Sequence, residues 1–309
     1  MIKIRELFFR NINDFHVLNG FFCKYFSFSF FLIHLCACHL SFDQKSDVAE
    51  AKTEERWISL APSYTHWLYI LGLDSHLVAR TDFCTQPKQA LEKPSVGSLF
   101  PPSLEKILSY KPTDVLMIEG HLALKESLRK LGIRIHEYPQ NTFEDIFQMI
   151  KALGTHFGVS DQSQSLIDQY RLKISEIKAK SEKRNTKSQR KIKVLYEVWT
   201  QPLTVAGQSN FFQDSLAVLG LENVIDLKES WPQITLESLF SKEIDLILCS
   251  TSAFCKDLRS NQTHPIWLEK RAVKSKNLIE IDQRFNQPSP QLFEDLVWLD
   301  HLIDQMKLE

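Results

Sequence analysis

The fold of this chain is decided by a stretch that occurs twice. Residues 103–116 have the sequence SLEKILSYKPTDVL, and residues 235–248 have the sequence TLESLFSKEIDLIL. Each copy begins with a hydroxyl residue that suits a helix N-cap, and continues through Leu, Glu and an apolar pair. Each copy then breaks and leads from an Asp into apolar residues typical of a buried strand. The separation is too long for a solenoid repeat, so the sequence predicts two similar lobes.

Each copy carries a glutamate in the first turn of its predicted helix, Glu105 in one and Glu237 in the other. A carboxylate at that position interacts favourably with the helix dipole, by about 0.3–1 kcal/mol. That stabilisation explains either residue alone. It does not explain why both lobes keep the same element, although an ancestral duplication would.

Length and charge limit the classes of function. A chain of 309 residues can hold two domains of ordinary size, and 43% of its residues are hydrophobic. Its formal net charge of -1 gives no electrostatic reason to expect a nucleic acid as partner.

The first 38 residues resemble a secretory signal. Arg5, Arg10 and Lys24 precede an apolar run at residues 25–38, which at about 14 residues is shorter than the ~20 that a membrane helix needs. The run ends in the sequence LCAC, which resembles a bacterial lipobox with Cys38 as the acylated residue. Cleavage by an ordinary signal peptidase and a retained N-terminal anchor are the alternatives. Export predicts the periplasm as location, with or without a lipid anchor facing it.

Residues 39–55 are polar and rich in Lys, Glu and Ala, which predicts a disordered tether. Beyond the signal segment the cysteines are Cys84, Cys249 and Cys255. An odd number allows at most one disulfide, and the sequence does not decide whether Cys249 pairs with Cys255.

Strands alternate with helices from residue 56 to 141 and again from residue 191 to 309, which predicts two α/β lobes with mostly parallel central sheets. Residues 142–190 have a helical pattern instead. A helix that begins at Ser160 can run for about 25 residues, or roughly 37 Å. We expect this helix to be a rigid connection that allows little closure of a ligand cleft between the lobes.

No catalytic set is found in the sequence: there is no G-x-S-x-G, P-loop, HExxH or CxxC motif. Aromatic residues instead occupy loops that follow predicted strands, where the ligand crevice of an open α/β sheet lies. Such side chains suit a large, flat, partly apolar ligand, although each could also pack under its own loop. The candidate ligand-binding residues are Phe83, Phe100, Trp199, Trp231 and Phe285.

The chain resembles a known family from about residue 56 to its end. Four segments carry the resemblance: RWISLAPS at 56–63, residues 96–112 with their Val-Gly-Ser, Ser-Leu-Glu and Lys-Pro motifs, LGLENVI at 219–225 and WPQITLE at 231–237. The family is that of the substrate-binding proteins of ABC importers whose lobes are joined by one long helix, called class III or helical-backbone metal receptors. Within it the chain is most similar to members that bind cobalamin (vitamin B12).

The resemblance implies a monomeric binding protein that catalyses nothing and delivers a corrinoid to a membrane permease. It implies that Phe83, Trp199 and Trp231 contact the corrin, and that Glu105 and Glu237 dock onto the permease. No metal site or cofactor is expected apart from the ligand.

Leu99 and Ile118 stand where cobalamin-binding members have tryptophans, which reduces the aromatic area. Haem or a ferric siderophore is therefore the alternative ligand. Candidate iron ligands for haem are Tyr64 and His66, and the candidate cations for a siderophore are Arg80 and Arg284. A third hypothesis is a bilobal enzyme similar to a chelatase. The export signal and the absence of a motif with the spacing of metal ligands argue against it.

Overall fold

The computed structural model describes residues 54–188, 190–260 and 263–306. The signal segment with Cys38, and all but the last two residues of the predicted tether, lie outside the described residues. Among the residues that are described, no helix is both long enough and apolar enough to cross a membrane.

The first lobe is built on a sheet of four parallel strands in the order β2-β1-β3-β4. Its strands are β1 (Trp57–Ser59), β2 (Leu77–Arg80), β3 (Asp114–Leu116) and β4 (Arg134–His136). Its helices are α1 (Pro62–Ile70), α2 (Leu104–Ser109) and α3 (Leu122–Lys130), with 3-10 turns η1 (Asp74–His76) and η2 (Lys88–Glu92).

The second lobe has the same parallel order, β7-β5-β8-β9, with a short antiparallel strand β6 added beside β5. Its strands are β5 (Ile192–Trp199), β6 (Thr204–Val205), β7 (Leu221–Asn223), β8 (Leu246–Cys249) and β9 (Leu278–Glu280). Its helices are α6 (Phe211–Val218), α7 (Ser252–Arg259), α8 (Pro265–Leu268), α9 (Arg271–Lys274) and α10 (Pro290–Gln305), with 3-10 turns η3 (Leu236–Leu239) and η4 (Gln283–Asn286). The shared order confirms the predicted pair of similar α/β lobes.

The repeated stretch occupies equivalent places, because its copies lead into β3 and β8. In the first copy Ser103 caps α2, its hydroxyl accepting a hydrogen bond from the Lys106 amide at 3.3 Å. The second copy forms the 3-10 turn η3 and not an α-helix, and the side chain of Thr235 makes no cap bond. The element recurs, but its helical form is tighter in the second lobe.

The Asp of each copy accepts hydrogen bonds at the start of its strand. Asp114 accepts a hydrogen bond from Arg134 Nε at 2.7 Å. Asp245 accepts one from Arg190 Nη1 at 2.6 Å and another from the Lys193 amide at 2.9 Å. The carboxylates therefore satisfy donors at the amino ends of both sheets, the edge opposite the carboxyl ends of the strands.

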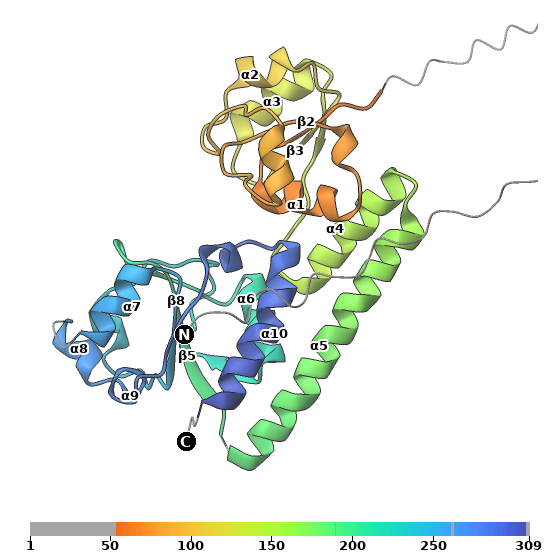
Figure 1. The fold of residues 1–309 in the computed structure, drawn as a ribbon. Coiled ribbons are helices and arrows are strands. Elements are labelled where there is room, and N and C mark those ends of the chain that lie inside the picture. Colours follow the sequence, from red (N-terminus) through yellow and green to blue (C-terminus); the bar gives the residue numbers. More distant parts are fainter. Residues whose placement is uncertain (1–53, 189, 261–262, 307–309) are drawn as a thin grey trace, which may run out of the picture. The chain divides into compact units, whose positions relative to one another are not determined.

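Two helices connect the lobes. In α4 (Phe143–His156) a capping box forms between Thr142 and Asp145, which satisfies two backbone donors of the first turn. Helix α5 (Ser160–Ser188) then runs for 29 residues, about 43 Å, longer than expected. It packs against α4, α6 and α10 (Figure 1).

Each sheet is covered on both faces, as parallel sheets require. In β5 the side chain of Leu195 enters a core with Phe254 and Trp267, whereas its neighbour Tyr196 enters a core with Phe212. Helices α7 to α9 accordingly lie on one side of this sheet, and α6 and α10 on the other (Figure 1).

Candidate functional site

A pocket of about 390 Å³ lies between residues of the two lobes. Its volume is in the range of roughly 300–1,000 Å³ typical of small-molecule sites. Several lining segments follow the carboxyl ends of β3, β4 and β9, where ligands bind in open α/β folds. The lining residues are Ile118, Glu119, Tyr138, Pro139, Gln140, Asn141, Asn210, Phe211, Ser230, Trp231, Asn286 and Pro288.

Three aromatic residues contribute to the apolar surface of the pocket. Phe211 and Trp231 meet edge to face, with ring centroids 6.1 Å apart. Tyr138 comes from the first lobe and lies edge to face with Tyr64 at 6.4 Å. Aromatic side chains from both lobes can therefore contact a single flat ligand.

The polar part of the pocket consists mainly of neutral amides that the protein already holds in place. Asn210 caps α6, its Oδ1 accepting from the Phe212 amide at 2.9 Å. Gln140 Oε1 accepts from the Ser63 hydroxyl at 3.1 Å. Among the described residues that line the pocket, Glu119 is the one charged side chain, and none is Lys or Arg. This lining matches a neutral ligand better than an anionic one.

Of the aromatics predicted from the sequence, the structure places Trp231 on the pocket wall. Phe83, Phe100 and Trp199 are absent from that wall, and more than half of each side chain is exposed to solvent. The ring of Phe100 stacks on His121 at 4.3 Å. These three side chains thus lie outside the pocket and are largely exposed to solvent.

Phe285 does not fit the prediction. Its side chain is 1% exposed and packs edge to face against Phe212 at 5.9 Å and Tyr196 at 6.2 Å. The turn η4 is capped by Asp282, which accepts from the Arg284 amide at 2.9 Å, and this turn directs the ring inward. Phe285 is thus a core residue of the second lobe.

The candidate iron ligands are also withdrawn from the pocket. Tyr64 is buried, and its hydroxyl donates to the Tyr138 carbonyl at 3.1 Å. Burial and the nearby Arg284 lower the pKa of His66 to about 4. Neither side chain lines the pocket.

The two candidate cations are engaged elsewhere. Arg80 is buried and donates to the carbonyl oxygens of Ala90 at 2.7 Å and Thr81 at 2.8 Å. Arg284 pairs with Asp282 at 2.8 Å. A negatively charged siderophore therefore meets neither guanidinium in this pocket.

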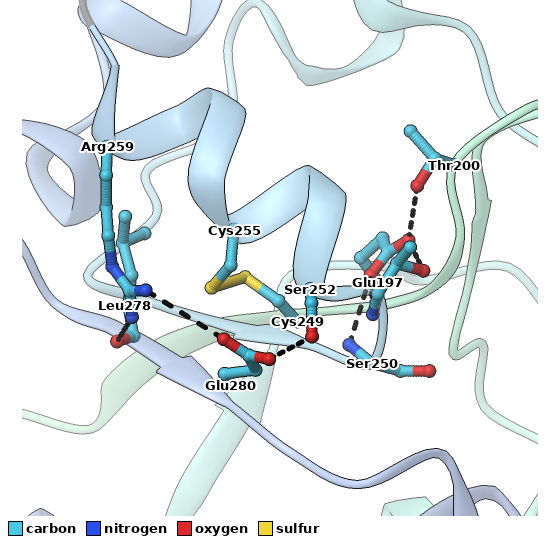
Figure 2. The surroundings of a disulfide bond; sticks show 10 residues. Glu197, Thr200, Cys249, Ser250, Ser252, Cys255, Arg259, Leu278 and Glu280 are labelled. Carbon is cyan, nitrogen blue, oxygen red and sulfur yellow. Dashed lines mark hydrogen bonds and ion pairs between the residues drawn. A yellow bond between two sulfur atoms is a disulfide. The ribbon is translucent and has the colours of Figure 1, made fainter.

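The described residues contain no group of three or more His, Cys, Asp or Glu side chains that could hold a metal ion. The cysteines settle the pairing that the sequence left open. Cys249, at the end of β8, forms a disulfide with Cys255 in α7 (Figure 2). Cys84 is a buried free thiol.

The two glutamates of the repeat are exposed in the first turns of α2 and η3. The pKa of Glu237 is lowered by hydrogen bonds from its own amide and from the Thr235 hydroxyl. Both carboxylates are thus presented to solvent, one on each lobe.

Several pocket residues were not predicted from the sequence. The sequence pattern predicts a strand that includes Tyr138 as its last residue, so the rule that selected Phe83 passed it over; the observed strand β4 ends at His136, which leaves Tyr138 in the loop. Phe211 and Asn286 carry no comparable signal, because their positions depend on how α6 and η4 pack.

The chain is similar to known proteins over most of its length. The family model described as "Periplasmic binding protein" matches residues 58–285. The vitamin B12-binding protein of Vibrio cholerae serotype O1 (strain M66-2) is 27% identical over 225 residues, which cover 72% of this chain and 80% of that protein. An ABC transporter substrate-binding lipoprotein, YvrC of Bacillus subtilis (strain 168), is 26% identical over 255 residues, covering 80% of this chain and 79% of that protein.

Solved structures support the fold. The periplasmic vitamin B12-binding protein BtuF of Vibrio cholerae matches with a TM-score of 0.69 and 24% identity, over 80% of this chain and 95% of that one. The periplasmic haem-binding protein HutB of Vibrio cholerae matches with a TM-score of 0.70 and 19% identity, over 81% of this chain and 99% of that one. The same architecture thus serves two different ligands.

Proposed function

The chain belongs to the periplasmic binding protein family, and from this premise we propose that it captures cobalamin between its lobes and delivers it to an ABC importer. It is a substrate-binding component of a transporter and not an enzyme.

The residues that line the pocket are the main observation in favour of cobalamin as the ligand. Cobalamin is large and flat, and its corrin ring bears neutral carboxamide side chains. The aromatic surface of Tyr138, Phe211 and Trp231 suits the ring, and the neutral amide lining suits the carboxamides. Haem bears two carboxylates, which favour Lys or Arg partners that the described lining residues lack.

Haem remains the alternative ligand because the structural likeness extends equally to haem-binding proteins. It would require an iron ligand in the pocket. Neither Tyr64 nor His66 lines the pocket, so Tyr138, which does, would be the tyrosine placed to ligate the iron.

The test is a calorimetric titration of the purified protein with cyanocobalamin and, separately, with haemin. We expect tight one-to-one binding of cyanocobalamin. Trp231→Ala should weaken it at least about tenfold, because a buried aromatic contact is lost. Trp298→Ala is the matched control: its side chain lies on α10, is 44% exposed and does not line the pocket. Binding of haemin alone would move the ligand assignment to haem.

The exposed aromatics Phe83, Phe100 and Trp199 belong to the same proposal, as further contacts with a ligand larger than the pocket. For the importer, we propose that Glu105 and Glu237 dock onto cationic residues of the permease. Their exposure in equivalent first turns of the two lobes supports a two-point contact.

The N-terminal sequence supports export to the periplasm, with Cys38 as the candidate for acylation. YvrC, a relative 26% identical to the chain, is named a lipoprotein. Mass spectrometry of the protein isolated from membranes tests this: a lipid-modified Cys38 at the new N-terminus is expected, and an unmodified one would contradict it.

A further inference from the structure

We infer that Asn286 is a specificity-determining residue, whose amide is fixed by Tyr196 and Ser250 so that it selects a ligand carboxamide over a carboxylate. This inference rests on the proposed function and identifies the residue that forms hydrogen bonds with one side chain of the ligand. Asn286 lies in η4, is half-buried and lines the pocket.

The orientation of the Asn286 amide follows from a chain of hydrogen bonds that runs in one direction. The Val198 carbonyl can only accept, so the Ser250 hydroxyl donates to it, at 3.2 Å. Ser250 Oγ then accepts from Asn286 Nδ2 at 2.9 Å. At the other side of the amide, Asn286 Oδ1 accepts from the Tyr196 hydroxyl. Ser250, whose one proton goes to Val198, thus specifies that the amide nitrogen faces it, and the amide oxygen is left to accept from Tyr196.

Both neighbours are held firmly. Tyr196 is 1% exposed, and burial raises the pKa of its phenol well above the usual value, so the hydroxyl stays a donor. Ser250 is fixed through its backbone, since its amide donates to Glu197 Oε2 at 3.1 Å and to the Glu197 carbonyl at 3.0 Å.

Glu197 is itself fully buried, and two further hydroxyls saturate its carboxylate. Thr251 Oγ1 donates at 2.7 Å and Thr200 Oγ1 at 2.9 Å, both to Oε1. Figure 2 shows Glu197 between Thr200 and Ser250, next to the disulfide that closes the same loop. A buried carboxylate with this many donors is a rigid anchor.

Two bonds leave Asn286 with one N–H and one Oδ1 lone pair for the pocket. A carboxamide on the ligand can satisfy both, through its own oxygen and its own N–H. A carboxylate has no donor, so the Asn286 lone pair would face another acceptor in a confined site. A flipped amide would draw the Ser250 proton away from the Val198 carbonyl and leave the Tyr196 hydroxyl facing an N–H, so the observed orientation, and with it this preference, is favoured by the protein.

The experiment compares cyanocobalamin with its monoacid derivatives, in each of which one side-chain carboxamide is hydrolysed to a carboxylate. We expect the protein to bind at least one derivative about tenfold more weakly than cyanocobalamin. Asn286→Ala should weaken cyanocobalamin binding about three- to tenfold and bring that derivative to within about threefold of it.

Ser250→Ala tests the positioning separately. It leaves Asn286 in place but removes the acceptor that orients Nδ2, so discrimination between amide and acid should fall in the same direction. Ser252→Ala is the matched control. Ser252 lies two residues after Ser250, at the start of α7, and its hydroxyl donates to Glu280 of β9 and not to Asn286 (Figure 2). We expect Ser252→Ala to discriminate as the unmodified protein does.

The inference is overturned if Asn286→Ala and Ser250→Ala keep the affinity and the amide-to-acid ratio of the unmodified protein. If Asn286→Ala does not fold, judged by thermal melting, Ser250→Ala decides. Binding of cyanocobalamin without discrimination would defeat this inference alone, whereas failure to bind it at all would defeat the proposed function as well.

Discussion

At the residue scale, the structure separates side chains that serve the pocket from those that only lie near it in sequence. Trp231 lines the pocket, whereas Phe285, also in a loop after a strand, is a core residue. Burial and partners make this difference, and neither is visible in local sequence.

His66 provides a pH-dependent test of burial in α1. Its pKa is lowered to about 4 by burial and by Arg284, whereas in the unfolded chain it is about 6.5. As the pH falls below about 6.5, His66 binds a proton in the unfolded state but not in the folded state. Folding stability therefore decreases until about pH 4, where the folded state also binds the proton.

We therefore expect the unmodified protein to lose stability between pH 7.5 and 5 relative to His66→Gln, which cannot titrate. Urea unfolding at the two pH values measures this difference. An equal change with pH in both proteins would mean that His66 protonates as freely in the folded chain as in the unfolded one.

At the scale of elements, the strongest patterns predicted the fold best. The apolar run at residues 246–249 and the long helical pattern after Ser160 both formed the predicted elements. Strand β6 and helix α7 were not predicted: β6 has two residues, and α7 is a short element that packs onto β9 and β8. Short elements of this kind depend on their neighbours more than on their own sequence.

The pocket was predictable only in part, for the same physical reason. The rule that loops after parallel strands surround the ligand found Trp231. It missed Tyr138 because the apolar pattern extends the predicted strand to that residue, whereas β4 ends at His136. The amides of Asn210 and Asn286 have places in the pocket that follow from an N-cap and a 3-10 turn in the second lobe. Sequence patterns indicate elements well, but not which side chains from distant elements share a pocket.

The disulfide belongs to the element scale because it joins β8 to α7 across the loop that holds Ser250. Its cysteines are 6 residues apart, and closing so short a loop stabilises a fold by about 2 kcal/mol in the chain-entropy model. We expect Cys249→Ser with Cys255→Ser to lower the free energy of unfolding by about that amount, measured in urea.

The matched control is Cys84→Ser, which removes a buried thiol but no cross-link. Under reducing conditions the unmodified protein should approach the stability of the double variant. A protein whose stability is insensitive to reductant would show that this bond adds nothing to the fold.

At the scale of the whole molecule, the lobes are connected through a shared core as well as through α5. Trp67 of α1 meets Tyr170 of α5 edge to face at 5.9 Å, and Phe293 of α10 at 6.3 Å. Its indole nitrogen donates to the Pro288 carbonyl at 2.8 Å, beside the pocket. Aromatic packing of this kind resists relative motion, so little closure on ligand binding is expected.

Because we expect little closure, we propose that a permease recognises the surfaces of the two lobes, through the exposed Glu105 and Glu237. Each exposed ion pair contributes little alone, so both must be removed together. We expect Glu105→Ala with Glu237→Ala to keep the affinity for cobalamin but to lower its uptake by cells that depend on this protein. Calorimetry and uptake of labelled cobalamin measure the two properties separately.

The matched control removes one exposed glutamate per lobe away from the repeated stretch, Glu126 in α3 and Glu222 in β7. It has the same loss of two charges, so a general change in electrostatic attraction would affect both double variants equally. If uptake fell equally in both, charge alone would explain the effect. If it fell in neither, the duplicated glutamates would be a remnant of lobe ancestry, held only by the helix dipole.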